Sequence, residues 1–418
     1  MLRRLIQTFA ARLGIALLNF AVVLVTARFL GAAGRGQVSL FVTDVALLLL
    51  FIGLLGGSSL IYLGARRNQW HLLVPASAWA TLVCLLGTAG VWLWRHPSPT
   101  YLLHLLGIAW LQAGLSITTS LLLARRREQT YNLLNLAQAG LLAGGLWLVL
   151  SGFEERTVAA YWWVSYPAYG LPLLVSLLLL ARTTDGWARG AGLRAAVREL
   201  AQHSRGAHFS NILSFLNYRL SYYFVAALAG PKAVGVLSVG TALAEAIWLI
   251  PRSAAQVQYL DLVHAHDEQT EAHATARTAR LALLATAAAV LALVALPAAV
   301  LARIFGPEFG AARPIIALLA PGTLAISLSM LMSSYFAGLA RYRINNWAQT
   351  VGIAVTLMGC AVLIPRYGAQ GAALATTISY LASTGYLLWQ FRRATTLSPS
   401  HFIPRWQDLA GWRQLLQR

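Results

Sequence analysis

Apolar runs of about twenty or more residues recur along the whole chain, and short gaps between them hold most of the polar side chains. A helix of about twenty apolar residues crosses the roughly 30 Å hydrocarbon core of a bilayer. The pattern therefore predicts an all-α polytopic membrane protein with about twelve transmembrane helices. The predicted spans are residues 5–29, 39–64, 71–94, 101–124, 131–151, 157–181, 206–229, 234–258, 278–304, 312–339, 344–365 and 369–391.

The short gaps make neighbouring helices antiparallel and divide the spans into two six-helix bundles. We predict an N-terminal bundle over residues 1–181 and a C-terminal bundle over residues 206–393. Between them, residues 182–205 are predicted to form a cytoplasmic amphipathic linker. Residues 394–418 are predicted to form a basic amphipathic tail at the same membrane face, because both segments alternate apolar and basic residues at helical spacing.

Charge sets the orientation of this predicted domain. The chain has 32 Lys+Arg against 13 Asp+Glu, and the basic residues gather in every second gap between spans. This bias is the positive-inside signature, and it predicts that both termini face the cytoplasm. The net charge of +19 is thus explained by topology, and nucleic acid is not an expected partner.

Composition excludes several classes of function. Only 11% of the residues are charged, and no gap is long enough for a soluble catalytic domain. Cys84 and Cys360 lie within apolar runs, so neither a disulfide framework nor a metal site is expected. No phosphate-binding loop ending in Gly-Lys-Ser/Thr occurs. We therefore expect neither an enzyme nor a bound cofactor.

The two predicted halves share a faint repeat. A G-x4-G-x2-S pattern occurs between the first two spans and again, 199 residues later, between the seventh and eighth. The residues are Gly31, Gly36 and Ser39 in the first copy and Gly230, Gly235 and Ser238 in the second. Arg127 and Asn132 are echoed by Arg341 and Asn346. Two halves of six helices each imply parallel repeats, a layout typical of transporters that bind their substrate between the halves.

Five ionisable residues fall within the predicted spans: Arg12, Asp44, Arg219, Glu245 and Arg252. A charge facing lipid is costly, so such residues are expected to face a cavity or one another. Polar stripes on the first, seventh and eighth spans predict a hydrated central cavity. Arg12 and Arg252 would make its inner part cationic and suited to a phosphate or pyrophosphate group.

We predict that this cavity binds substrate through Arg12, Asn19, Arg219, Tyr222, Trp248 and Arg252. Asp44 and Glu245 are predicted to couple an ion or to balance charge. An internal salt bridge between Glu245 and either Arg219 or Arg252 is the alternative for those residues. Asp44 could equally bind a proton or cation, pair with an arginine, or face water in a vestibule.

Several segments resemble bacterial polysaccharide and O-antigen flippases, which share a superfamily with multidrug exporters and lipid II flippases. They are ARFLGAAGRGQVSLFVTDVALLLLFIGLLGGSSLIYLGARR (27–67), NYRLSYYFVAALAGPKAVGVLSVGTALAEAIWLIPRSAAQVQYLD (217–261), FGPEFGAARPIIALLAPG (305–322) and PRYGAQGAALATTIS (365–379). The resemblance implies two six-helix bundles that move an undecaprenyl-pyrophosphate-linked oligosaccharide from the inner to the outer leaflet. It implies a cavity lined by arginines such as Arg12 and Arg252, with Asp44 as the nearby acid.

The same resemblance implies a place in the bacterial inner membrane and in the synthesis of O-antigen, lipopolysaccharide or another surface polysaccharide. Membrane lipids, a polysaccharide polymerase and a chain-length regulator are the partners it suggests. A cation-coupled multidrug exporter of the same fold is the main alternative. An O-antigen polymerase or ligase is disfavoured, because such an enzyme needs a sizeable outer loop and the outer gaps here are short.

Overall fold

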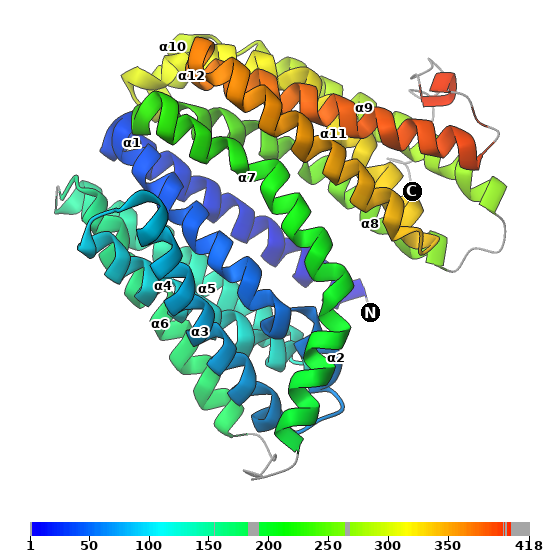
Figure 1. Ribbon diagram of the computed structural model, residues 1–418. Helices are drawn as coiled ribbons and strands as arrows, with labels where there is room; N and C mark the ends of the chain where they lie inside the picture. The colour runs from blue at the N-terminus through cyan, green and yellow to red at the C-terminus, as the bar shows by residue number, and fades with distance from the viewer. Residues whose placement is uncertain are drawn as a thin grey trace. The chain divides into compact units, whose positions relative to one another are not determined.

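The computed structural model describes residues 2–153, 155–182, 192–263, 268–395, 397 and 399–402. The chain divides into two compact units, Met1–Phe215 (unit 1) and Leu216–Arg418 (unit 2), and each is described by itself. Every secondary-structure element in the described part of the chain is a helix, and none is a strand (Figure 1). Residues 183–191 of the predicted linker and 403–418 of the predicted tail lie outside the described residues.

Three very long helices each consist of two arms, and each arm covers all or the greater part of one predicted span. They are α1 (Leu2–Gly56), α7 (Gly192–Ile247) and α12 (Tyr342–Ala394). Each is interrupted by one glycine with positive φ: Gly31 (68°), Gly230 (79°) and Gly368 (55°). Side-chain bonds show that the chain folds back at these points. Arg35 donates to Thr26 Oγ1 (2.9 Å) across the first, and Ser379 donates to the Gly352 carbonyl (2.8 Å) across the third.

Nine helices among the described residues are long and apolar enough to cross a membrane. Because α1, α7 and α12 each count once but contain two arms, this agrees with the predicted twelve spans. The all-α polytopic fold with two groups of six spans is therefore confirmed. Essentially only glycine adopts a positive φ together with an extended ψ. A single glycine is therefore enough to reverse the chain at such a point.

Unit 1 adds five shorter helices and one π-helical turn to α1. They are α2 (Ser58–Gly64), α3 (Gln69–Arg95), α4 (Pro99–Ala124), α5 (Glu128–Trp147), the π-helical turn Leu148–Gly152, and α6 (Val158–Ala181). Local sequence starts two of them: the Asn68 side chain accepts from Trp70 N–H at the head of α3, and Ser98 accepts from Tyr101 N–H at the head of α4. Large apolar side chains such as Phe41, Leu60 and Leu105 fill the core between these helices.

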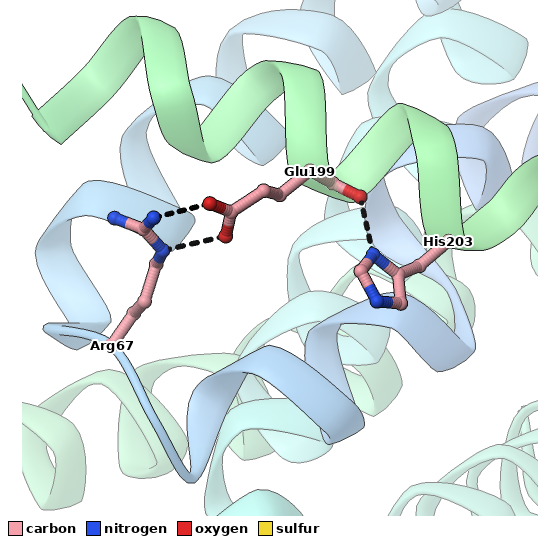
Figure 2. Close-up of polar contacts among 3 residues, drawn as sticks. All are labelled: Arg67, Glu199 and His203. Carbon is pink, nitrogen blue, oxygen red and sulfur yellow. Dashed lines mark hydrogen bonds and ion pairs between the residues drawn. The ribbon is translucent and has the colours of Figure 1, made fainter.

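The first turns of α7 belong to unit 1 because they are bound to the end of that bundle. Glu199 forms a two-pronged ion pair with Arg67, from the loop between α2 and α3 (Figure 2). His203 Nδ1 lies 2.9 Å from the Glu199 carbonyl oxygen, and its ring stacks on Tyr62 at 4.8 Å. Ser204 donates to Ser59 Oγ at 2.8 Å. α7 is thus a helix whose two ends lie in different units.

Unit 2 contains the rest of α7 and the remaining helices. They are α8 (Leu249–Val263), α9 (Glu268–Val294), α10 (Ala298–Phe305), the 3-10 turn Pro307–Ala311, α11 (Ala312–Gly338) and α12. Three spans that we predicted to be continuous are wrong in detail. Span 39–64, in unit 1, breaks at Gly57, between α1 and α2. Span 234–258 breaks at Trp248, between α7 and α8, and span 278–304 breaks between Val294 and Ala298. Pro251 and Pro297 lie at the last two breaks, and a proline cannot donate the helical hydrogen bond four residues back.

The faint internal repeat corresponds to repeated backbone geometry. Gly31 (φ 68°, ψ −175°) and Gly230 (φ 79°, ψ 173°) adopt the same conformation at the same place in their units. The turns after α4 and α11 also match. Arg126 (φ 60°) and Ala340 (φ 56°) are left-handed, and the next N–H groups, of Arg127 and Arg341, bond to carbonyls five residues back. These are two copies of one helix-ending motif, which supports a parallel repeat.

Candidate functional site

In unit 1, Arg12 and Asn19 lie on the first arm of α1, and both side chains are exposed. They are seven residues apart, so they share one face of the helix about 10 Å apart along its axis. Within the described part of the chain, Arg12 takes part in none of the salt bridges. Its guanidinium group is therefore available to bind an anionic group that contacts this face of α1.

Asp44, on the second arm of α1, has a very different environment. Its side chain is fully buried and forms an ion pair with Arg95, at the end of α3. The Tyr101 hydroxyl, from the first turn of α4, donates to the same carboxylate oxygen. Of the three roles left open for Asp44, the geometry matches the arginine partner, and burial is at odds with a carboxylate facing water in a vestibule.

In unit 2, Arg219 is held by Glu245. Two parallel bonds of 2.8 and 2.9 Å join the guanidinium to the two carboxylate oxygens. The residues are 26 positions apart, which would be about 39 Å along a straight helix, so the reversal at Gly230 is what brings them together. The Arg219 guanidinium also lies 5.5 Å from the centre of the Tyr222 ring. This is the internal salt bridge that the sequence left open as an alternative.

Trp248, at the break between α7 and α8, forms a cluster of three rings with Tyr218 and Tyr380. The ring centres are 5.3 Å apart for Trp248–Tyr218, 6.0 Å for Trp248–Tyr380 and 5.9 Å for Tyr218–Tyr380. Trp248 is buried, and its indole N–H has no hydrogen-bond partner among the described residues. One helical turn further on, the Arg252 side chain is exposed and takes part in none of the salt bridges of the described chain.

Beside this cluster lies a polar network that the sequence analysis missed. Asn217 accepts from Ser379 (2.9 Å) and Thr356 (3.3 Å) and donates to Gln349 (3.0 Å). The network joins α7 to both arms of α12. Serine and threonine are common within membrane helices, and α12 has no charge near this point, so no local signal distinguishes its residues. Tyr380 was missed for the same reason.

The structure thus separates the predicted residues into two groups. The embedded acids Asp44 and Glu245 are each held by an arginine, which cancels their charge locally. Arg12 and Arg252 have no acidic partner in the described chain. Among the predicted site residues, the charge that no acid cancels is cationic, and such charge pairs with anionic oxygens, those of phosphate above all.

No protein-family profile matches the sequence, and no curated protein matches it significantly. Solved structures do share its fold. The lipid II flippase MurJ, in an inward-closed conformation, matches with a TM-score of 0.70 and 12% identity over 96% of this chain and 89% of MurJ. An inward-facing multidrug-resistance MATE transporter of the MOP superfamily gives a TM-score of 0.66 and 12% identity, over 91% of this chain and 94% of its own.

The Vibrio cholerae MATE transporter VcmN gives a TM-score of 0.59 and 16% identity, over 96% of this chain and 98% of its own. At these identities the likeness concerns the fold alone. Together with the apolar helices, it establishes that the chain is a multi-pass membrane protein with the fold found in MurJ and the MATE transporters.

Proposed function

We propose that this protein is a transporter that moves an undecaprenyl-pyrophosphate-linked oligosaccharide from the inner to the outer leaflet by alternating access. It would act in the bacterial cytoplasmic membrane, with both termini in the cytoplasm, during the synthesis of O-antigen or another surface polysaccharide. The lipid-linked oligosaccharide and the surrounding membrane lipids would be its principal partners. A polymerase and a chain-length regulator would then act on the delivered glycan.

The observation that carries this proposal is the pair Arg12 and Arg252. Both side chains are exposed, Arg12 on the first arm of α1 and Arg252 on α8, and neither has an acidic partner in the described residues. Both residues lie within spans predicted from the sequence, where a charge is costly and calls for a function. A pyrophosphate offers several anionic oxygens, and a guanidinium fork can bind such a group bidentately.

The remaining predicted residues would accept the glycan. Asn19 offers amide donors and acceptors on the same face as Arg12, two turns away. Trp248 has a buried indole N–H without a partner among the described residues, next to two tyrosine rings. Arg219 and Tyr222 would shape this end of the site, because the bond to Glu245 fixes the guanidinium in place.

A reconstituted flipping assay with a fluorescent polyprenyl-pyrophosphate oligosaccharide tests the proposal. Arg12→Ala and Arg252→Ala should each lower the flipping rate at least about tenfold, the effect of losing roughly 1.4 kcal/mol of a charge-assisted contact. Arg366→Ala is the matched control, since it removes an exposed arginine between two predicted spans. Normal flipping by the double Arg12→Ala/Arg252→Ala variant, with normal expression, would disprove the assigned site.

A cation-coupled multidrug exporter is the second candidate. The observation in its favour is Asp44, a fully buried carboxylate on a membrane-spanning helix, since buried membrane acids often relay protons. Against it, both acids among the predicted site residues are already paired with arginine, leaving no free anion to attract a cationic drug. Proton-dependent efflux of a cationic dye from vesicles, abolished by Asp44→Asn and unaffected by Arg252→Ala, would favour this candidate.

A further inference from the structure

A cavity of about 390 Å³ opens within unit 1, between the second arm of α1 and α3. All of its lining residues are apolar or glycine, and they include Leu48 and Phe51 of α1 and Trp79, Gly90 and Trp94 of α3. No charged or hydroxyl-bearing side chain lines it. A ligand held here would therefore be bound by apolar contact alone.

Two glycines of α3 shape this cavity in different ways. A Cβ atom on Gly87 would lie 1.9 Å from Leu48 Cδ2, so Gly87 lets the Leu48 side chain pack against the α3 backbone. A Cβ atom on Gly90, one turn further along, would meet nothing within 4 Å. Gly87 thus allows α1 and α3 to pack closely, whereas the space beside Gly90 is left open between them.

Aromatic residues mark the two ends of the cavity along α3. At one end, the Trp79 indole donates to the Phe51 carbonyl (3.1 Å), which fixes its ring to α1. At the other, Trp94 is 59% exposed. Trp79 and Trp94 are fifteen positions apart, which is about 22 Å along the helix and most of the hydrocarbon thickness of a bilayer. The groove is therefore long enough to hold part of an extended hydrocarbon chain.

A cation lies beside the Trp94 end. The Arg95 guanidinium is 5.4 Å from the centre of the Trp94 ring, and about a quarter of its side chain (24%) is exposed, although it also pairs with Asp44. The groove thus runs from a wholly apolar trough to a guanidinium group at one end. An apolar groove with a guanidinium group at one end matches a single long hydrocarbon chain that ends in an anionic group.

We propose that this α1–α3 groove binds the polyprenyl chain of the transported lipid. The inference rests on the proposed function, which supplies a substrate with one long apolar chain on a pyrophosphate. Bulk phospholipids share the anionic head but have two acyl chains on it, whereas the groove is one trough with one cation at its end. The groove would hold the chain while the head group moves.

Photolabelling of the intact protein in nanodiscs tests this directly. The probe is a polyprenyl phosphate with a diazirine on the chain, and the readout is the labelled peptide. We expect labels on the groove residues, 47–51 of α1 and 79–94 of α3, that excess undecaprenyl phosphate removes and an equal excess of phosphatidylglycerol does not. Labels elsewhere, or equal displacement by phosphatidylglycerol, would overturn the inference, the latter showing a groove for ordinary membrane lipid.

Two variants add a functional readout. Gly90→Leu fills this open space and should reduce both labelling and flipping at least about tenfold. Gly144→Leu, on α5, is the matched control, because its added side chain also starts in open space but away from the groove. Unchanged labelling in Gly90→Leu would count against the groove.

The two proposals fail separately. If the wild-type protein flips the substrate but is not labelled at these groove residues, the groove is wrong and the function stands. If it is labelled there but moves no lipid-linked oligosaccharide, the groove binds polyprenyl chains and the proposed function is wrong. The wild-type measurement needs no variant to fold, so labelling tests the groove and flipping tests the function independently.

Discussion

At the scale of single residues, the backbone conformation of Gly31 and Gly230 determines where two of the long helices reverse direction. Each combines a positive φ with an extended ψ at the point where a long helix folds back on itself. Residues with a side chain are strongly disfavoured there, because Cβ clashes with the backbone. The repeated G-x4-G-x2-S pattern therefore records a conformational requirement, and the contact between Arg219 and Glu245 depends on it.

Replacing Gly230 by alanine tests this requirement. Apart from the backbone of Gly230 and its two neighbours in the chain, the added Cβ would meet no atom within 4 Å, so any penalty comes from the backbone conformation alone. We expect Gly230→Ala to destabilise the protein by about 1–3 kcal/mol. Thermal unfolding in detergent measures the effect. Gly53→Ala is the control: Gly53 is helical and equally open, so this change should be neutral or stabilising by about 0.5–1 kcal/mol. Equal midpoints for the two variants would contradict the argument.

Residue-scale contacts also mark the limit of what the sequence could predict. The embedded charges stood out because charge is rare in apolar runs, and Glu245 was correctly considered as a partner of Arg219. The partner of Asp44 was not predicted, because Arg95 is 51 positions away in a gap between spans. Asn217 contacts residues 132 to 162 positions away, and no sequence pattern in either segment predicts such a contact.

At the scale of elements, α7 begins bound to unit 1 and continues into unit 2. The Arg67–Glu199 ion pair is the strongest polar contact of its first turns, and the guanidinium lowers the pKa of the Glu199 carboxyl below its ordinary 4.5. Since the lowered pKa belongs to the folded state, the pair adds stability above pH 4.5. That stability is lost as the pH falls through the folded-state pKa.

The expected result is a pH-dependent difference between wild type and Glu199→Gln. At pH 7 the wild type should have the higher unfolding temperature, and the gap should close as the pH is lowered below 4.5. Thermal unfolding at several pH values measures it. His203 also contacts the Glu199 carbonyl, so His203→Gln serves as the control for the loss of that neighbouring contact. A gap that stayed constant from pH 7 to pH 3.5 would show that the ion pair does not dock α7.

Elements were the level at which the sequence was most informative. Membrane thickness fixes how long an apolar helix must be, so the spans could be found from hydropathy alone. Their interruptions were harder to predict. Pro251 and Pro297 are common kinds of residue in membrane helices, and whether a proline bends a span or breaks it depends on the neighbouring helices that satisfy the freed carbonyl.

At the scale of the whole molecule, the repeat makes a prediction about topology. The turns at Arg126 and Ala340 have the same backbone conformation and occupy equivalent places in the two units. Parallel repeats place such turns on the same side of the membrane, whereas inverted repeats would place them on opposite sides. The basic residues around both turns predict that this side is the cytoplasm.

Cysteine accessibility in intact cells measures this. The native Cys84 and Cys360 are buried, so they should react little with an impermeant maleimide. Arg126→Cys and Ala340→Cys should be labelled only after the membrane is opened, and Lys232→Cys, on the opposite predicted side, should be labelled in intact cells. Labelling of Arg126→Cys and Ala340→Cys from different sides would exclude the parallel repeat. A reversed pattern would move Arg12 and Arg252 towards the outer leaflet, away from a pyrophosphate lipid made in the cytoplasm, so topology is also a test of the proposed direction of transport.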